Sequence, residues 1–303
     1  MITTSYSKGV FFAVAGFSIW GILPLYWRLL LAVAPLHLLS FRILFSLLLL
    51  GIILSVQKNF LWLTVFKDIK NCCLVIFASL ILCINWGVFI WAVNNDRVIE
   101  SALGYYISPL VSVVLGLIFF KEKLSILQWA AFGFACLGVL FLTLFSGTLP
   151  WISLVLAICF GFYGVLKKKI AIPSMESLAA ETLAAAPLGI LLLFIQVDTT
   201  GSVILDAHGL SYLAALGPAV LIPLAFSGLL TSLPLYCFGH SAKLLPLSSL
   251  GFFQFIAPTF SFFIGLFVFG EFFPPHHFAA VAFIWLAAIL YIISLKRRQA
   301  DDR

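Results

Sequence analysis

Residues 105–122, YYISPLVSVVLGLIFFKE, return in altered form 149 positions later as residues 254–271, QFIAPTFSFFIGLFVFGE. Four residue types recur in register, so that Pro109, Ser112, Gly116 and Glu122 correspond to Pro258, Ser261, Gly265 and Glu271. Neither copy carries a charge before its end, and about 20 apolar residues suffice to cross the hydrocarbon core of a membrane. The pattern therefore predicts a membrane-spanning helix that occurs once in each of two related halves.

The composition of the whole chain is typical of a membrane protein. Hydrophobic residues make up 63% of the 303 residues, charged residues only 9%, and the mean hydropathy is +1.19. A soluble domain carries about 25% charged residues, so these few charges cannot cover a surface that faces water. Most of the surface is expected to face lipid.

Ten apolar runs have the length that a transmembrane helix needs. They cover residues 9–28, 36–55, 72–94, 99–120, 125–145, 150–167, 178–197, 211–239, 247–270 and 275–295. The expected fold is therefore an all-α integral membrane protein with ten transmembrane helices. Because Lys8 precedes a full-length run with no small-residue cleavage site after it, we expect the first run to be retained as a helix.

The basic residues give these helices an orientation. With the N-terminus in the cytoplasm, 14 of the 17 Lys and Arg residues, residues 167–169 among them, fall on the cytoplasmic side. Only Arg28 and Arg97 fall on the other side, and Arg42 lies within a span. Such a bias is typical of cytoplasmic loops. We therefore expect both termini in the cytoplasm, and the net charge of +6 does not indicate nucleic-acid binding.

The repeat divides the chain into two five-helix halves, residues 1–146 and residues 147–303. Because five is odd, the second half enters the membrane from the opposite side. Inverted repeats of this kind are common in secondary transporters, which bind their solute between the repeats near the middle of the membrane. We expect a solute site to lie between the two halves.

One face of each repeated helix carries its unusual residues. Offsets of 0, 4, 7 and 11 place Tyr105, Pro109, Ser112 and Gly116 on one side of a helix, and the equivalent face holds Gln254, Pro258, Ser261 and Gly265. The prolines break helices, and the glycines favour close packing between helices. We expect Tyr105 and Gln254 to line a solute path, although helix packing alone would also explain such a face.

Several segments resemble the RarD-type permeases of the drug/metabolite transporter superfamily, the group with paired EamA repeats. They are residues 20–27 (WGILPLYW), 85–86 (NW), 89–94 (FIWAVN), 100–110 (ESALGYYISPL), 246–259 (PLSSLGFFQFIAPT) and 270–271 (GE), so the resemblance covers almost the whole chain. It implies ten helices around a central cavity and the transport of small metabolites or drugs across the bacterial inner membrane. Where the family tends to have a His-Arg pair, this chain has Phe41-Arg42, which puts any role of that His in proton handling in doubt.

Two charges lie inside the predicted spans and away from their ends, where each costs roughly 2.5–3.5 kcal/mol on insertion scales. Arg42 and Glu181 occupy equivalent helices of the two halves, and both are candidates for coupling. Arg42 stays protonated and could hold an anionic group, whereas Glu181 could take up a proton if burial disfavours its charged form. The inversion places them nearer opposite membrane faces, so we do not expect a direct pair, and either could instead reach toward the lipid headgroups.

Other polar and aromatic side chains complete the predicted solute site. Asn85 and Trp86 adjoin in the third span, where the amide could bind solute or tie two helices together. Trp20, Tyr163 and Tyr236 could stack against a ring-bearing or cationic solute. The predicted substrate-binding set is Trp20, Arg42, Asn85, Trp86, Tyr105, Tyr163, Tyr236 and Gln254.

Missing motifs narrow the function. The chain has no Gly-x4-Gly-Lys-Ser/Thr loop, no His-Glu-x-x-His and no Gly-x-Ser-x-Gly, and its six cysteines show no metal-ligand spacing. We therefore expect no enzyme activity, no cofactor and no metal. The favoured function is a secondary transporter, an exporter by alternating access, whose partners are a small-molecule solute and the lipid bilayer. An uncoupled facilitator or channel, an amino-acid importer, the use of protons and a homodimer remain open.

Overall fold

A computed structural model of the chain describes residues 2–95, 97–146, 151–197, 203–205, 217–270, 272 and 275–301. Within these ranges, ten helices are long and apolar enough to cross a membrane. In chain order they are α1 (Ile2–Trp27), α2 (Pro35–Val56), α4 (Ile69–Asn94), α5 (Val98–Phe120), α6 (Ile126–Ser146), α7 (Trp151–Lys169), α8 (Ser174–Leu193), α10 (Pro218–Leu244), α11 (Leu247–Gln254) together with α12 (Ile256–Phe267), and α13 (Pro275–Asp301). The prediction of ten transmembrane helices is confirmed.

Short elements lie between some of these helices. They are the 3-10 turns η1 (Arg28–Leu30) and η2 (Val65–Lys67), the short helix α3 (Leu61–Thr64), and the antiparallel strands β1 (Ile195–Val197) and β2 (Val203–Leu205). The predicted span 178–197 is therefore displaced, because α8 runs only to Leu193 and the β-branched residues that follow pair as a strand. Residues 211–216 of the predicted eighth span lie outside the described residues, and α10 begins at Pro218.

The ninth span is interrupted, because α11 ends at Gln254 and α12 begins at Ile256. Pro258 explains the position of this break. A proline lacks the backbone N–H and its ring clashes with the carbonyl four residues earlier, which here belongs to Gln254. The predicted ninth span is present as Leu247–Phe267, and its interruption at Phe255 agrees with the expectation that Pro258 breaks a helix. Pro109 holds the equivalent place in α5, yet α5 continues through it.

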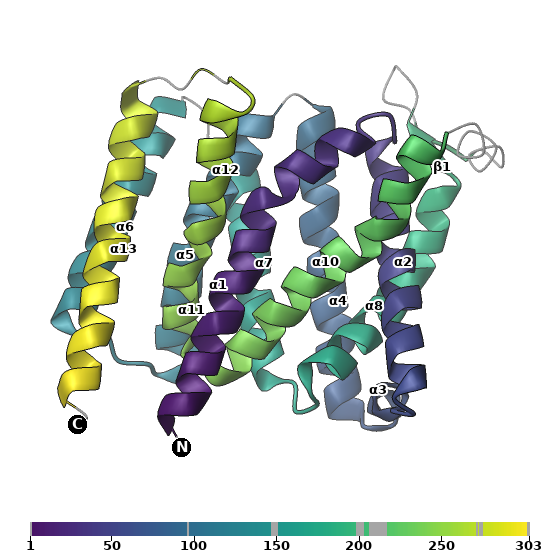
Figure 1. Cartoon of the computed structure of the whole chain (residues 1–303), viewed down its shortest axis with the longest axis horizontal. Coiled ribbons are helices and arrows are strands. Elements are labelled where there is room, and N and C mark those ends of the chain that lie inside the picture. Colours follow the sequence, from purple (N-terminus) through teal and green to yellow (C-terminus); the bar gives the residue numbers. More distant parts are fainter. Residues whose placement is uncertain are drawn as a thin grey trace.

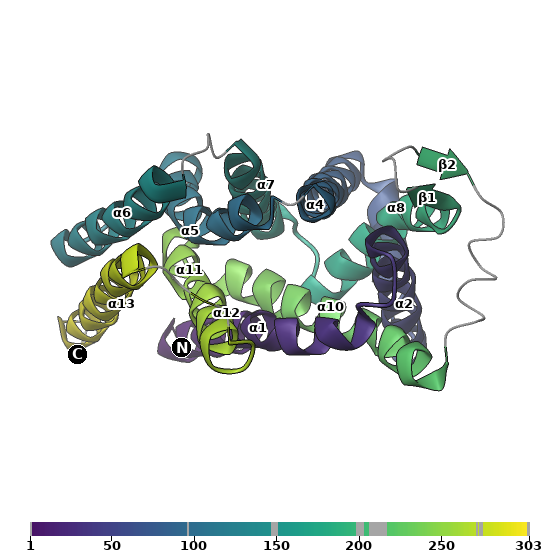
Figure 2. The ribbon, with the colours of Figure 1, turned by 90° about the horizontal axis from the view of Figure 1, so that it is seen from above.

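Most of the spanning helices form a closed ring. Viewed along the bundle, α5, α7, α4, α8, α2, α10 and α1 follow one another, and α11 with α12 closes the circle back to α5 (Figure 2). Helices α6 and α13 pack against each other as an outer pair. The two ends of the chain lie at the same end of the bundle (Figure 1).

The neighbours in this ring recur between the halves. Each span of one half corresponds to the span five places away in the other half, so that α1 corresponds to α7, α2 to α8, and α4 to α10. The contact of α1 with α10 therefore corresponds to that of α7 with α4, and the contact of α2 with α10 to that of α8 with α4. All four contacts occur. Helices that correspond to each other also touch, as α2 does with α8, α5 with α11, and α6 with α13. This two-fold pattern supports the proposal that residues 1–146 and 147–303 are two inverted halves.

Helices α2 and α10 approach each other closely at Gly228. A Cβ atom on Gly228 would lie 2.4 Å from the carbonyl carbon of Phe45 and 2.6 Å from the backbone nitrogen of Ser46. In return, the Ser46 hydroxyl donates a hydrogen bond of 3.1 Å to the Gly228 carbonyl. Only glycine leaves room for this contact, which holds α2 and its Arg42 against α10.

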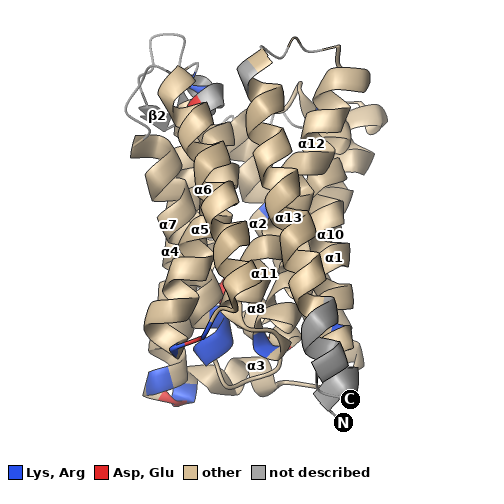
Figure 3. Cartoon of the chain, turned by 90° about the vertical axis from the view of Figure 1, so that its left-hand side faces the viewer, with Lys and Arg blue, Asp and Glu red and all other residues tan. Residues whose placement is uncertain are grey.

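Charges are concentrated at one end of the bundle. Figure 3 shows most of the Lys and Arg residues at the end where the chain begins and finishes, with long stretches of helix above them that carry few charged residues. This distribution is the one that the count of basic residues predicts for a membrane protein with a cytoplasmic end.

Candidate functional site

Arg42 in α2 lies among side chains from three other helices. Its Nε donates a hydrogen bond of 3.0 Å to the hydroxyl of Thr231 in α10. Its guanidinium carbon lies 4.8 Å from the ring centroid of Trp27 in α1 and 5.3 Å from that of Trp86 in α4. No other hydrogen bond and no ion pair of Arg42 occurs in the described part of the chain. A permanent charge therefore faces aromatic rings with both terminal amino groups unpaired.

Tyr105 brings α5 to the same place. It interacts electrostatically with Arg42, and its ring lies 6.3 Å from that of Phe89 between centroids. Tyr105 is 55% exposed. The predicted residues Arg42, Trp86 and Tyr105 thus meet in one site. Trp27 and Thr231 belong to it too, although the sequence analysis did not select them.

A narrow pocket adjoins this site between α2, α4, α8 and α10. Trp86 and Thr231 line it, as does Glu181. Hydroxyl groups make up much of its polar lining, contributed by Ser46, Ser79, Thr182, Thr231 and Ser232. Its free space is about 20 Å³, which is room for roughly one water molecule. In this conformation the pocket is too small for a metabolite, but it joins the surroundings of Arg42 to Glu181.

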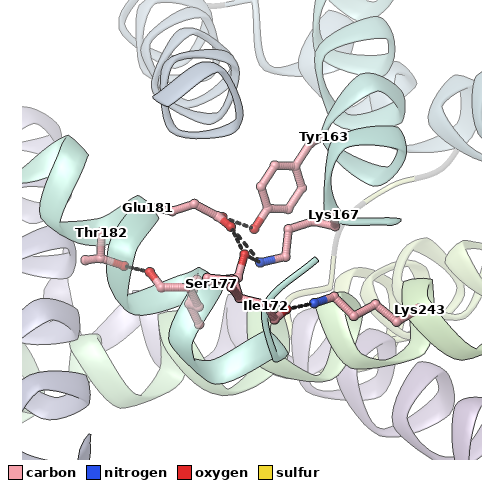
Figure 4. A network of polar contacts seen from close by, with 8 residues as sticks. Tyr163, Lys167, Ile172, Ser177, Glu181, Thr182 and Lys243 are labelled. Atoms are coloured by element: carbon pink, nitrogen blue, oxygen red, sulfur yellow. Dashed lines mark hydrogen bonds and ion pairs between the residues drawn. The ribbon is translucent and has the colours of Figure 1, made fainter. Parts of the chain in front are cut away.

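Glu181 forms a buried ion pair with Lys167 (Figure 4). Its Oε1 lies 2.7 Å from the Lys167 Nζ and accepts a hydrogen bond of 2.5 Å from the Ser177 hydroxyl. Its Oε2 accepts one of 2.9 Å from the Tyr163 hydroxyl. Lys167 Nζ also donates to the Ser177 oxygen at 2.9 Å. The side chains of Lys167 and Glu181 are only 0% and 2% exposed, and buried charges persist when partners satisfy them in this way.

Lys167 is buried, which its position in the sequence did not indicate. The predicted span 150–167 ends at this residue, whereas α7 runs on to Lys169 and the Lys167 side chain is buried. Its aliphatic stem passes Gly239 of α10, where a Cβ atom would lie 2.7 Å from the Lys167 Cε. The absence of a side chain at Gly239 therefore lets Lys167 reach α8.

Two further lysines join the same three helices near their ends. Lys168 in α7 donates a hydrogen bond to the carbonyl of Leu245, directly after α10. Lys243 in α10 donates to the carbonyl of Ile172, directly before α8 (Figure 4). Together with Lys167 they tie α7, α8 and α10 together at the basic end of the bundle.

An aromatic cluster borders the ion pair. Tyr163 stacks on Phe238 with 5.7 Å between ring centroids and an interplanar angle of 13°. Trp20 lies 5.6 Å from Phe160 and 6.0 Å from Phe238. Trp20 and Tyr163 thus share two aromatic neighbours, and Tyr163 is fully buried and faces no open space in this conformation. Tyr236 contacts Phe12 and His240.

Two of the predicted solute-binding amides tie helices together. The Asn85 amide in α4 donates a hydrogen bond of 2.9 Å to the Leu156 carbonyl in α7, which fits the alternative role considered for it. Gln254 is 4% exposed; it donates to Ser112 at 2.7 Å and accepts from Ser108 at 3.1 Å, both in α5. The expectation that Gln254 lines open space does not fit its position between α5 and α11.

Glu122, one of the residues that recur in the repeat, has a structural role. Its carboxylate accepts hydrogen bonds from the backbone N–H groups of Leu247 and Ser248 at 2.7 and 2.8 Å, and from the Ser248 hydroxyl at 2.6 Å. A carboxylate at this place satisfies the free N–H groups at the start of α11. A Cβ on Gly116 would lie 2.6 Å from that carboxylate, so Gly116 makes the room. Gly265 is buried in α12, and Glu271 lies outside the described residues.

Comparisons with known proteins agree with this architecture. A model of the EamA-like transporter family matches residues 7–144. Protein RarD of Streptomyces exfoliatus is 37% identical over 284 residues, which are 93% of this chain and 87% of the relative. The transporter YojE of Bacillus subtilis is 37% identical over 293 residues, 95% and 94% of the two chains. Protein RarD of Escherichia coli is 34% identical over 287 residues, 94% of each.

A solved crystal structure shares the fold. It superposes with a TM-score of 0.69 at 16% sequence identity and covers 94% of this chain and 97% of that chain. Ten spanning helices and relatives named as transporters define a multi-pass bacterial membrane transporter of a small-molecule solute. The chain belongs to the EamA family of transporters, within its RarD group, as the sequence segments predict.

Proposed function

We propose that this protein is a secondary transporter that exports a small metabolite or drug across the bacterial inner membrane by alternating access. The observation that carries the proposal is Arg42, whose terminal amino groups have no hydrogen-bond or ion-pair partner among the described residues. A charge within a span costs roughly 2.5–3.5 kcal/mol on insertion scales, and such residues commonly mark a substrate path. Thr231 comes from the second half and Trp27, Trp86 and Tyr105 from the first, as expected for a site between two repeats.

The basic end of the bundle supplies the closed gate in this proposal. Lys167, Lys168 and Lys243 hold α7, α8 and α10 together there, and the cluster of Trp20, Phe160, Tyr163 and Phe238 borders the ion pair. Arg42 lies two turns from the start of α2, nearer the opposite end. The solute site would therefore open away from the basic end, and transport would require the lysine contacts to separate.

Glu181 is the proposed coupling residue. Proton uptake by Glu181 would remove the charge that holds Lys167, which weakens the contact between α7 and α8. The pocket between Thr231 and Glu181 has room for about one water molecule. The buried Ser232 hydroxyl lines it and has no hydrogen-bond partner among the described residues, so a water there would satisfy it. Such a water would also carry protons between the solute site and the gate.

The orientation follows from the charges. Both termini are proposed to face the cytoplasm, since they share the basic end of the bundle (Figure 3). The Arg42 site and the lysine contacts are built within one chain, so the proposal does not depend on a homodimer. A facilitator without ion coupling and an amino-acid importer are the alternatives, and flux measurements separate them.

The first prediction concerns flux through purified protein in proteoliposomes. Vesicles are loaded with a broad metabolite panel, and the release of each solute is followed by mass spectrometry with and without a pH gradient. We expect release to depend on the protein and on the gradient, and to fall more than about tenfold in Arg42→Gln, because that change removes about 1.5–3 kcal/mol of charge-assisted bonding. Arg28→Gln, which removes an arginine packed on Phe269 at 4.2 Å, is the matched control and should retain flux.

Each part of the proposal has its own contrary outcome. If no solute in the panel is released faster from vesicles with the protein than from protein-free vesicles, transport is contradicted. Release that ignores the pH gradient would contradict coupling through Glu181 and favour a facilitator. Equal loss of flux in Arg42→Gln and Arg28→Gln would show that Arg42 has no special role.

A further inference from the structure

We infer that the solute bound by Arg42 is a flat-ringed organic anion that lacks a compensating ammonium group, with aromatic carboxylates as the simplest class. This inference rests on the proposed function and specifies what the transporter carries. It follows from three properties of the site: unused donors, ring-bearing walls and the lack of an unpaired acid among the described residues that line the adjoining pocket.

The unused donors select an anion. A guanidinium presents five N–H donors in a fork that fits a carboxylate with two parallel hydrogen bonds. Only the Nε donor of Arg42 is engaged, by Thr231, and this bond fixes the plane of the group. The terminal amino groups stay free among the described residues, and Tyr105 lies within electrostatic reach of them. A carboxylate would therefore find two N–H donors and a nearby hydroxyl.

The walls select a flat apolar body. The rings of Trp27 and Trp86 both approach the guanidinium, and Phe89 contacts the ring of Tyr105. Aromatic walls of this kind bury a solute ring through stacked or edge-to-face contacts. A small hydrated anion such as acetate would use the charge of Arg42 but leave these surfaces uncovered, so it should bind more weakly.

The lack of a free acid disfavours zwitterions. The acids whose side chains are described are Asp68, Glu100, Glu122, Glu176 and Glu181, and each already has a hydrogen-bond or ion-pair partner. Glu181, which lines the adjoining pocket, is neutralised by Lys167. Because the described acid that lines this pocket is already paired, the ammonium group of an amino acid would meet the positive charge of Arg42 without an unpaired carboxylate in the same pocket. A deaminated acid should bind more tightly than the amino acid with the same ring.

The test uses ligands that share one ring and differ in charge. Binding of phenylacetate, phenylacetamide, 2-phenylethylamine and phenylalanine to the purified full chain is measured by calorimetry, with acetate as the ringless anion. We expect phenylacetate to bind most tightly. Phenylacetamide and 2-phenylethylamine should bind about ten- to a hundredfold more weakly, which is the range that a charge-assisted bond supplies. Phenylalanine and acetate should also bind at least about tenfold more weakly.

Two variants connect the preference to Arg42. Arg42→Gln should lose the preference for phenylacetate over phenylacetamide, whereas Arg28→Gln should keep it. Thr231→Val keeps the charge but frees the guanidinium, so it should weaken phenylacetate binding and still reject 2-phenylethylamine. If Arg42→Gln fails to fold, Thr231→Val still tests the role of the Arg42 guanidinium.

The contrary results separate this inference from the proposed function. Tighter binding of phenylalanine or 2-phenylethylamine than of phenylacetate, unchanged phenylacetate affinity in Arg42→Gln, or no binding of any member of the set would overturn the inference. If the protein transports a neutral or cationic solute and Arg42→Gln leaves that flux unchanged, the inference of an anionic solute is overturned but the proposed transport function is not. If phenylacetate binds through Arg42 but no solute is transported, the proposed transport function is overturned and the anion-binding site at Arg42 remains supported.

Discussion

At the residue scale, the described charges within the helices differ in how their partners satisfy them. Lys167 and Glu181 satisfy each other with the help of Tyr163 and Ser177, whereas Arg42 keeps unused donors beside aromatic rings. Removing one partner of a buried pair typically costs about 3–5 kcal/mol, but replacing both by apolar residues is often close to neutral. Stability and function can therefore be separated at the ion pair.

A double substitution tests that separation. Lys167→Met and Glu181→Leu are each expected to lower the free energy of unfolding by about 3–5 kcal/mol, because each leaves a buried charge without its partner. The double variant Lys167→Met/Glu181→Leu should regain most of this loss, and its flux should no longer respond to a pH gradient. Reversible unfolding in detergent and proteoliposome flux measure the two effects. A double variant as unstable as the sum of the single ones would contradict the pair as the source of the loss.

At the scale of helices, close approaches depend on particular glycines and prolines. Gly228 brings the backbones of α2 and α10 together, and Pro258 separates α11 from α12 at the carbonyl of Gln254. Glu122 then holds the start of α11 from the end of α5. These contacts position the helices that surround Arg42.

Two glycine-to-alanine substitutions, one at a close helix contact and one in open space, should differ sharply. Gly228→Ala is expected to destabilise the protein by about 1–3 kcal/mol, since its Cβ would overlap the α2 backbone, where overpacking is not relieved by rotating a side chain. Gly51 lies in α2 with no atom within 4 Å of an added Cβ. Gly51→Ala should therefore be neutral or stabilising, because alanine favours a helix by about 1 kcal/mol over glycine. Thermal unfolding of both variants compares them, and equal midpoints would contradict the close approach.

At the scale of the whole molecule, the eight-span ring and the outer pair α6–α13 fix the direction of every helix. Once one end is assigned to the cytoplasm, all other loops are assigned with it. The basic residues indicate which end faces the cytoplasm. The matching contacts of α1 with α10 and of α7 with α4 agree with two inverted halves.

Labelling of single cysteines tests this orientation. In a chain whose six native cysteines are replaced, Lys67→Cys and Lys169→Cys should react with a membrane-impermeant maleimide only after the cells are opened. Arg97→Cys, at the other end of the bundle, should react in intact cells; the Arg97 side chain is 45% exposed. Lys169 follows the first span of the second half, so its labelling from the outside would contradict the proposed inversion.

Local sequence patterns predicted the ten helices because a hydrocarbon environment demands long, uncharged runs whatever their neighbours are. Their limits were less predictable where packing decides, as at Leu193, which is followed by a strand, and at Phe255, where Pro258 interrupts the helix. Among the site residues, Arg42, Trp86 and Tyr105 stood out by charge or by the repeat. Thr231 did not, since a hydroxyl in a helix carries no signal until its partner from another helix is known.

The sequence by itself determined the membrane-spanning class, the number of spans and the family, and it predicted the relation between the halves. Each of these depends on composition and on periodic spacing along the chain. Only the tertiary structure decided which charges have partners. Lys167 and Glu181 are 14 residues apart in neighbouring helices and pair, while Arg42 meets Thr231 across 189 residues and keeps free donors. The energy of a buried charge depends on what surrounds it in space, and the chain order alone does not contain that information.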